Sequence, residues 1–398
     1  MHKKHIPDPV IFVLKAELNP QFNFKVKKIL FLGDINSSHL IKWATSLADK
    51  GFEIGIFSLN KSTFEWYKPY PAIHIFNEVD RNDNFFKSSM FNKLEYLLYT
   101  RKIKKAIRDF QPDVVHAHYA TSYGLIGRLS GFRPYIISVW GSDIFDFPHI
   151  SIINKKLIQR NLRYPDMVMS TSHIMKKEIL KYVDREVEVT PFGVDTNLFL
   201  PKDVKRITNQ HDIVIGAIKQ IEKKYGTDVL IHAFKKVCTA NPDKSFKLLI
   251  VGSGTMKEAC IALVKELNLE DKVIFTGKVP PEKVPDYHNV IDIYCNISIL
   301  DSESFGVSVV EAMACGKPVI VTNVGGLPEV VTHNETGLII EKENPAAAAE
   351  AIQRLIDDKQ LGERLVKNAM KHVHEQYSWN DNIQHIIQLY SKFVAIPQ

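Results

Sequence analysis

Short runs of apolar residues alternate along the chain with longer segments whose apolar positions recur every three or four residues. The short runs are rich in Val, Ile and Phe, as in buried strands, and the longer segments have the period of helices. At 186–201 the pattern breaks into a linker, after which a second series of the same kind begins. The expected strands are 27–34, 53–59, 72–76, 113–118, 134–140 and 166–172 before the linker, and 212–219, 247–254, 272–278, 290–298, 317–323 and 337–342 after it.

Strands that alternate with helices predict a parallel sheet with helices on both faces. A chain of 398 residues is too long for one ordinary core. We therefore predict an α/β protein of two doubly wound, Rossmann-like domains, 1–195 and 196–379, which face each other across a cleft. Ligands of such sheets bind at the carboxyl ends of the strands.

Composition narrows the class of protein. The chain is 45% hydrophobic and 24% charged, and no apolar run approaches the roughly 20 residues of a membrane span. The apolar run 10–14 is too short for the core of a signal peptide. Four cysteines without CxxC spacing indicate buried free thiols in a reducing cytoplasm.

The positive charge is concentrated in the first half of the chain. Residues 1–200 carry 28 Lys and Arg against 20 Asp and Glu, with basic clusters at 101–108 and 155–163 and aromatic residues before the first cluster. Two interpretations stay open: an amphipathic face that rests on an anionic membrane, and a solvated helix face. No nucleic-acid-binding motif accompanies the charge, so we expect no nucleic-acid partner. We expect a cytoplasmic protein, peripheral at the inner face of the membrane if the first interpretation holds.

The stretch 301–331 carries the most specific chemistry. It predicts a loop that runs into a helix, with Ser304 as N-cap and Gly316 as the stop. Unpaired amides at the helix start form an anion site, and Glu311, one turn deeper, can accept two hydrogen bonds from a vicinal diol. Glu303 reaches the group on the other side of a bound phosphate. Alternatively, Glu303 merely caps the helix and Glu311 is a solvated surface residue. The expected anion-site amides are those of Phe305, Gly306, Val307 and Ser308.

Glu303-x7-Glu311, followed by EAMACGKPVIVTNVGGLPEVV, resembles the donor-site signature of family 4 glycosyltransferases with the GT-B fold. The resemblance runs from about Lys28 to the C-terminus. It implies that Glu303 contacts the donor sugar, Glu311 the ribose and the intervening amides the diphosphate. It also implies that 380–398 forms a helix that crosses back to the first domain.

The resemblance extends to other loops of the second domain. Lys219 and Lys224 stand where the family usually has an arginine and a lysine on the diphosphate. Lysine supplies charge there but no bidentate fork. A solvated loop is the alternative for Lys224. Gly252 forms a tight turn after a strand, and the segment Gly277, Lys278 and Val279 matches the place where the family recognises the base.

Three loops of the first domain are candidates for the acceptor side. Gly33, Asn36 and Ser37 offer donors after the first strand, although the Gly-Gly pair of many family members is absent. In the HAH motif, the resemblance places His118 on the donor sugar. A metal pair with the other histidine lacks an evident third ligand. For Asp143, turn capping and substrate contact both stay open.

The resemblance therefore implies a retaining, metal-independent glycosyltransferase with a UDP- or GDP-linked sugar as co-substrate and no cofactor. The acceptor is a glycan, a lipid-linked molecule or a small molecule, as in polysaccharide or glycoconjugate biosynthesis. The catalytic group comprises His118, Lys219, Lys224 and Glu303. A nucleotide-sugar epimerase or phosphorylase of the same fold and a non-catalytic nucleotide-sugar-binding protein are the alternatives.

Overall fold

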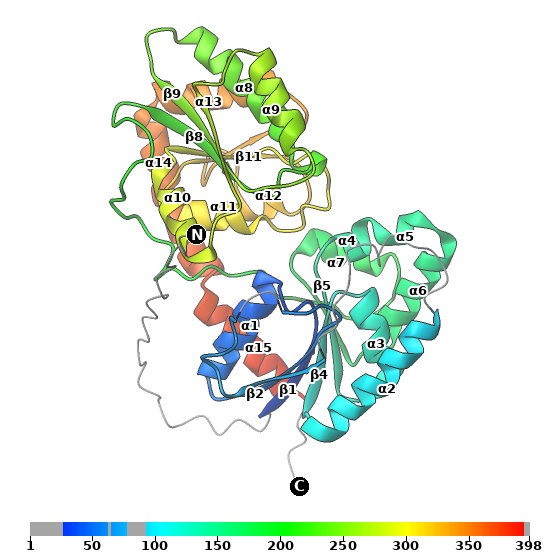
Figure 1. The fold of residues 1–398 in the computed structure, drawn as a ribbon. Helices are drawn as coiled ribbons and strands as arrows, with labels where there is room; N and C mark the ends of the chain where they lie inside the picture. Colours follow the sequence, from blue (N-terminus) through cyan, green and yellow to red (C-terminus); the bar gives the residue numbers. More distant parts are fainter. Residues whose placement is uncertain (1–26, 63–64, 78–92, 394–398) are drawn as a thin grey trace, which may run out of the picture.

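The computed structural model describes residues 27–62, 65–77 and 93–393, which form two α/β domains (Figure 1). The described first domain holds one parallel sheet with strand order β3-β2-β1-β4-β5-β6-β7. Its central strands β4 and β5 are buried throughout, and β1 is buried after its first residue, which explains their continuous apolar runs. The strands are β1 (Lys28–Leu32), β2 (Glu53–Phe57), β3 (Ile73–Asn77), β4 (Val114–His118), β5 (Tyr135–Val139), β6 (Met167–Ser170) and β7 (Glu188–Val189).

Helices cover both faces of this sheet. On one face α1 packs with the C-terminal helix α15, and the other face is covered by α2, α3, α6 and α7. The helix α15 thus belongs to the first domain although it ends the described chain. The helices are α1 (Ser38–Asp49), α2 (Lys93–Phe110), α3 (Ser122–Ser130), α4 (Ser142–Phe145), α5 (Phe147–Ile150), α6 (Ile152–Arg163), α7 (His173–Leu180) and α15 (Trp379–Ser391).

The second domain repeats the arrangement with strand order β10-β9-β8-β11-β12-β13, again parallel. Its strands are β8 (Ile213–Ile218), β9 (Phe246–Val251), β10 (Val273–Gly277), β11 (Ile293–Asn296), β12 (Val319–Thr322) and β13 (Leu338–Ile340). Its helices are α8 (Thr227–Ala240), α9 (Lys257–Glu266), α10 (Val284–Val290), α11 (Val307–Ala314), α12 (Leu327–Val330), α13 (Pro345–Asp357) and α14 (Lys359–Gln376), with short 3₁₀ turns η2 (Lys223–Tyr225) and η3 (Pro281–Lys283).

Two chain segments cross between the domains and pair with each other. Val194, after β7, donates its N–H to the carbonyl of Tyr377 at 2.8 Å and accepts from the N–H of Trp379 at 2.9 Å. A Cβ at Gly193 would lie 2.9 Å from the Cα of Trp379, so this close crossing needs the glycine. The crossings form one narrow connection at which the domains can hinge.

Side-chain contacts also join the domains directly. The Ser304 hydroxyl donates to the carbonyl of Trp140 at 2.9 Å. The Glu329 carboxylate, on α12, accepts from the N–H groups of His173 and Ile174 at 2.7 and 2.5 Å. Glu329 therefore stabilises the N-terminus of α7 in the other domain, where the helix dipole favours negative charge.

Two details differ from the sequence-based expectations. The segment 186–201 is not wholly a linker, because Glu188–Val189 forms the edge strand β7. Ser304 is not the N-cap of α11, which begins at Val307 after Gly306. The start shifts because Gly306 takes a left-handed conformation (φ +88°), while the Ser304 side chain binds across the domain interface.

Candidate nucleotide-sugar site

The start of α11 presents a row of free amides. In the described part of the chain, none of the N–H groups of Phe305, Gly306, Val307 and Ser308 donates a hydrogen bond. A Cβ at Gly306 would lie 2.6 Å from Leu327, so glycine is required both by the conformation and by the packing. These amides and the helix dipole provide the elements of an anion site.

The two glycines after β12 hold the loop that leads into α11. Gly326 donates its N–H to the carbonyl of Glu303 at 2.9 Å, and Gly325 donates to the Asp301 carboxylate at 3.2 Å. A Cβ at Gly325 or Gly326 would lie 2.0 or 2.2 Å from a carbonyl of this loop. The conspicuous GG pair of the sequence is therefore a backbone support for the Glu303 loop.

Glu303 is 7% exposed and forms an ion pair with Lys219, whose Nζ lies 2.5 Å from Glu303 Oε2. The Ser298 hydroxyl donates to the same oxygen at 3.2 Å. Glu303 is thus held by side chains from two neighbouring loops, and it does not merely cap the helix. The ion pair also places Lys219, which is predicted to bind the diphosphate, beside Glu303, which is predicted to bind the sugar.

Lys224 lies on the same side of the domain as Lys219. The Nζ atoms of Lys219 and Lys224 lie 4.7 and 4.8 Å from the centroid of the Tyr225 ring. The loop that carries them is tied down at Glu222, whose carboxylate accepts from Thr255 N–H at 2.9 Å. The two lysines therefore project from a braced turn, whereas their contact with a diphosphate stays a prediction.

Glu311 is 19% exposed at its side chain and is oriented by a buried neighbour. His288, from α10, is fully buried and its Nε2 lies 3.3 Å from Glu311 Oε2. Lys42, from α1 of the first domain, faces the same region. Burial lowers the pKa of Lys42 to about 8, while Glu311 and Asp195 act in the opposite direction. The surface-residue alternative for Glu311 does not fit these surroundings.

The predicted base-recognition segment lies at the ends of neighbouring strands. Gly252 donates its N–H to the carbonyl of Gly277 at 3.0 Å, and a Cβ at Gly252 would lie 1.9 Å from the carbonyl of Lys219. Lys278 is exposed and Val279 is half-buried. The structure thus brings the Gly252 turn against the lysine loop, whereas contact with a base stays a prediction.

The first domain contributes aromatic and histidine side chains. His118, at the end of β4, is 2% exposed, and its ring packs 4.7 Å from Trp140 and 4.5 Å from His116. Burial, followed by His116 and His39, holds the pKa of His118 well below its usual value. A neutral imidazole beside the interface can donate one hydrogen bond and accept another.

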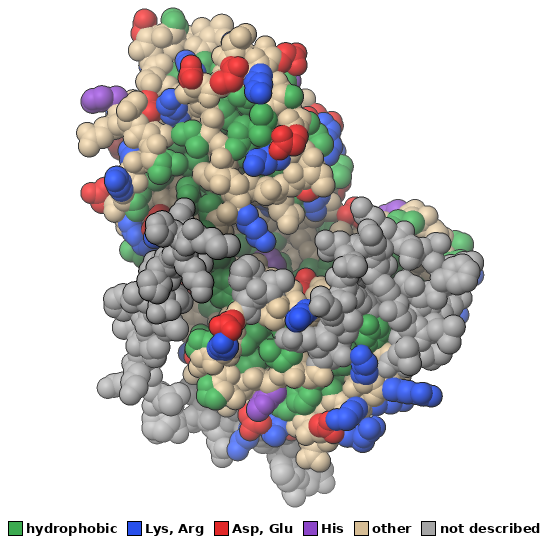
Figure 2. Space-filling model, in the orientation of Figure 1, with side chains coloured by type: hydrophobic (Ala, Val, Ile, Leu, Met, Phe, Trp, Pro, Cys, Tyr) green, Lys and Arg blue, Asp and Glu red, His purple; other side chains and the backbone are tan. Residues whose placement is uncertain are grey.

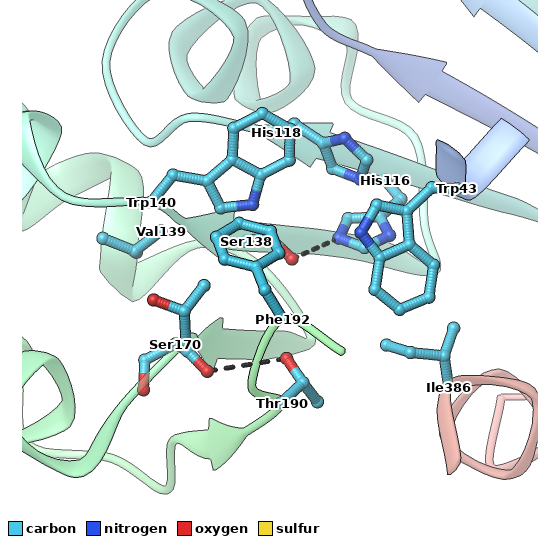
Figure 3. A pocket seen from close by; sticks show the side chains of 11 residues that line it. Trp43, His116, His118, Ser138, Val139, Trp140, Ser170, Thr190, Phe192 and Ile386 are labelled. Atoms are coloured by element: carbon cyan, nitrogen blue, oxygen red, sulfur yellow. Dashed lines mark hydrogen bonds between the residues drawn. The ribbon is translucent and has the colours of Figure 1, made fainter. Parts of the chain in front are cut away.

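A small cavity of about 10 Å³ is bordered by His118 and His116 (Figure 3). His116 does not point a free nitrogen into it, because its nitrogens lie 2.7 Å from Tyr390 Oη and 2.8 Å from Ser138 Oγ. Burial lowers the pKa of His116 to about 3. These contacts use both ring nitrogens, so His116 is a structural histidine that joins β4 to β5 and α15. The lining residues are Trp43, His116, His118, Ser138, Val139, Trp140, Ser170, Thr171, Thr190, Phe192 and Ile386.

Three predicted acceptor-side residues lie in the loop after β1. A Cβ at Gly33 would lie 3.5 Å from Cβ of His118, so this loop adjoins the HAH strand. The Asn36 amide donates to the carbonyl of Lys61 at 2.8 Å, and Ser37 precedes α1 without a side-chain cap. Their contact with an acceptor stays a prediction.

Asp143 is fully buried, and its carboxylate accepts from the N–H groups of Ala120, Trp140 and Gly141 at 2.7, 3.2 and 2.9 Å. Burial raises its pKa to about 6, against the effect of these hydrogen bonds. Of the two roles that the sequence left open, the structure supports turn capping. Direct contact with an acceptor does not fit, because both oxygens face the backbone.

Four residues of this region were not predicted from the sequence. His39 stacks on Phe192 with ring centroids 4.1 Å apart, and burial, then Lys42 and Lys219, lowers its pKa to about 4. Lys42 and His288 flank Glu311, and Glu329 joins the domains. Their place in the first two turns of the helix after β1 was the available hint for His39 and Lys42. No local pattern shows that His288 flanks Glu311 or that Glu329 joins the domains.

Comparison with known proteins agrees with this arrangement. Residues 202–372 match the family model described as glycosyl transferases group 1, and residues 28–172 match the model described as glycosyl transferase 4-like. N-acetyl-alpha-D-glucosaminyl L-malate synthase from Bacillus anthracis is 29% identical over 83% of this chain and 87% of its own length. D-inositol 3-phosphate glycosyltransferase from Acidothermus cellulolyticus is 28% identical over 71% of this chain and 68% of its own length.

Solved structures share the fold. Sucrose-phosphate synthase from Thermosynechococcus elongatus superimposes with a TM-score of 0.77 at 20% identity, covering 92% of this chain and 98% of that chain. Anabaena HepE in complex with UDP and glucose gives a TM-score of 0.75 at 20% identity, covering 92% of this chain and 100% of that chain. The two family models divide at the junction of the two domains. The chain belongs to the family 4-type glycosyltransferases and has the GT-B fold.

Proposed function

We propose that this glycosyltransferase moves a sugar, with retention of anomeric configuration and without a metal ion, from a UDP- or GDP-linked donor to an acceptor held by the first domain. The observation that carries the proposal is the convergence of the Lys219–Glu303 pair with the free amides before α11. A sugar diphosphate presents neutral hydroxyls and negative phosphates, which match a carboxylate beside cations and amides.

In this proposal Glu311 accepts from the ribose hydroxyls, Glu303 and His118 orient the sugar, and the amides receive the diphosphate. The bond between the anomeric carbon and the β-phosphate oxygen breaks while the acceptor oxygen bonds to that carbon. The acceptor proton passes to a phosphate oxygen. Negative charge grows on the departing diphosphate, and Lys219 and Lys224 stabilise it.

The acceptor is expected to lie beside the loop Gly33–Ser37. Two relatives carry L-malate and D-inositol 3-phosphate in their names, both of which are anionic small molecules. The excess of basic over acidic residues in 1–200 suits such acceptors, and it suits a glycan or lipid-linked acceptor at an anionic surface equally.

Among the described residues, no helix is long and apolar enough to cross a membrane. We propose a cytoplasmic enzyme with peripheral contact at the inner face of the membrane. Lys and Arg side chains gather over the outer face of α2 (Figure 2), where Arg101, Lys102, Lys104, Lys105 and Arg108 are exposed. The aromatic residues predicted to accompany them, from Phe85 to Tyr99, fall largely outside the described residues.

A donor panel tests the proposal. One UDP- or GDP-sugar should raise the melting temperature more than the others, and transfer from it should persist in excess chelator. Activity that is lost in EDTA and restored by manganese or magnesium would reject the metal-independent mechanism. Saturable donor binding with no transfer or hydrolysis on any acceptor would favour a non-catalytic nucleotide-sugar-binding protein.

A further inference from the structure

Three isoleucines stand exposed around one turn of the first domain. Ile150 ends α5, and Ile152 and Ile153 begin α6; their exposed fractions are 73%, 66% and 62%. No other large apolar side chain among the described residues exceeds 49% exposure. Such a cluster on a water-facing turn usually marks an interaction site.

Hydrogen bonds fix the backbone of this turn. The Ser151 hydroxyl caps α6 by accepting from Asn154 N–H at 3.1 Å. The Asn154 amide donates back to the carbonyl of Phe147 at 3.3 Å, and Pro148 of α5 is buried. The isoleucines are therefore presented outward by a held backbone, which reduces the entropy lost on binding.

A basic stripe continues from the isoleucines along α6. Lys155 and Lys156 follow Ile152 by three and four residues, and Arg160 and Arg163 continue at the same helical spacing. All four are exposed, whereas Ile158 and Leu162 bury the opposite face. No Asp or Glu occurs from 147 to 165. The surface thus combines an apolar tip with uninterrupted positive charge, which complements an anionic surface that has an apolar interior.

We propose that the α5–α6 turn inserts Ile150, Ile152 and Ile153 into an anionic lipid bilayer, with the α6 basic stripe on the headgroups. The inference rests on the proposed peripheral membrane contact and assigns that contact a site. The sequence pattern alone pointed to charge at 155–163 and gave no sign that the adjacent isoleucines are exposed.

The position of the α5–α6 turn would bring an inserted membrane close to the proposed active site. The segment that carries it leaves the carboxyl end of β5 through Trp140, whose carbonyl accepts from Ser304 of the donor domain. The turn therefore lies on the strand-end side of the first sheet, towards the outer edge of that domain (Figure 1). A bilayer bound there lies near the mouth of the site, where an acceptor with a lipid anchor would enter.

The test is flotation of the full chain with vesicles of equal parts phosphatidylglycerol and phosphatidylcholine. The triple variant Ile150→Ser, Ile152→Ser, Ile153→Ser should bind at least about 10-fold more weakly than the unsubstituted chain, because the inserted apolar area is lost. Its residual binding should vanish as salt rises, whereas the unsubstituted chain should retain part of its binding through insertion. Ile153→Trp should gain fluorescence quenching by brominated lipids.

A matched control replaces apolar residues that are exposed elsewhere. Ile75→Ser, Leu198→Ser, Ile207→Ser removes three side chains of 41%, 40% and 49% exposure and should bind vesicles like the unsubstituted chain. Equal vesicle binding by both triple variants would overturn the inference. It would also be overturned if the unsubstituted chain formed a dimer that the variant at Ile150, Ile152 and Ile153 does not form, because the isoleucines would then be a protein interface. Nucleoside-diphosphate affinity, measured without vesicles, should be the same in all three proteins, so a failed insertion is distinct from a failed donor site.

Discussion

The two domains present unlike surfaces to each other. The second domain presents charge: Lys219 paired with Glu303, the free amides before α11, and Glu311. The first domain presents rings, among them His118 and Trp140, with histidines that burial keeps uncharged. Apart from Lys42 of the first domain, the groups that suit an anionic leaving group are therefore concentrated in the second domain, and the first supplies a wall of rings.

This difference indicates a division of labour. Charge on a departing diphosphate is best stabilised by fixed cations and amides that need no reorganisation. A wall of packed rings excludes water and strengthens those electrostatic interactions. If the division is correct, substitutions in the second domain should act on rate and nucleotide affinity. Substitutions in the ring-lined part, apart from His118, should act on stability and its pH dependence.

The largest effect is expected at the braced lysine turn. Lys224→Ala should lower kcat by roughly 10²–10³-fold with a smaller effect on donor KM, because charge on the leaving group grows towards the transition state. Lys223, its exposed neighbour, forms an ion pair with Asp228 at 2.7 Å and is the matched control. Steady-state kinetics should leave Lys223→Ala near the unsubstituted rate. Equal rates for both variants would remove Lys224 from the site.

A second prediction concerns the neutral histidines of the first domain. Burial lowers the pKa of His116 to about 3, so its contribution to stability is complete above pH 6.5 and is lost as pH falls towards 3. Between pH 7 and pH 5 this loss amounts to about 2 kcal/mol of unfolding free energy, from the unfolded pKa of about 6.5.

Urea unfolding at pH 7 and pH 5 measures this loss of unfolding free energy. His116→Gln removes the titrating group and should shrink the acid-induced loss by about that 2 kcal/mol. His385→Gln, at an exposed position of the same domain, should leave the loss unchanged. An identical pH dependence in His116→Gln and the unsubstituted chain would show that this histidine is not held neutral.

The smallest effect is expected where the domains meet. Glu329→Gln weakens the cap on α7 and should cost the contact between the two domains about 1 kcal/mol, the usual magnitude for a helix cap. Solution X-ray scattering should then report a larger radius of gyration than for Glu335→Gln, an exposed control on the same domain. Equal radii would mean that the Glu329 contacts do not hold the domains together.

The sequence predicted best what depends on neighbours along the chain. Buried parallel strands carry their own apolar runs, so the strands of both sheets were predicted, except the two-residue edge strand β7. The donor region was predicted because Glu303, Gly306 and Glu311 lie within nine consecutive residues. The helix start was misplaced because the capping preference of Ser304 is overridden by its bond to Trp140, 164 residues away.

The other contacts were not predicted because their partners are far apart in the sequence. Glu329 meets α7 across 156 residues, and His116 meets Tyr390 across 274. No pattern at either position reveals its partner. The buried state of Asp143 was likewise not foreseen, because turn capping and substrate contact use the same residue type at the same place.

The central claim is that the start of α11 with Glu311 binds a nucleoside diphosphate, and calorimetric titration with UDP and GDP tests it most directly. The account predicts saturable binding of at least one nucleotide without added metal. It further predicts a loss of roughly 1–3 kcal/mol in Glu311→Ala, the range for a hydrogen bond to a charged group. Binding should be unchanged in Glu335→Gln. Absence of binding by either nucleotide, or equal affinities in Glu311→Ala and the unsubstituted chain, would contradict the account.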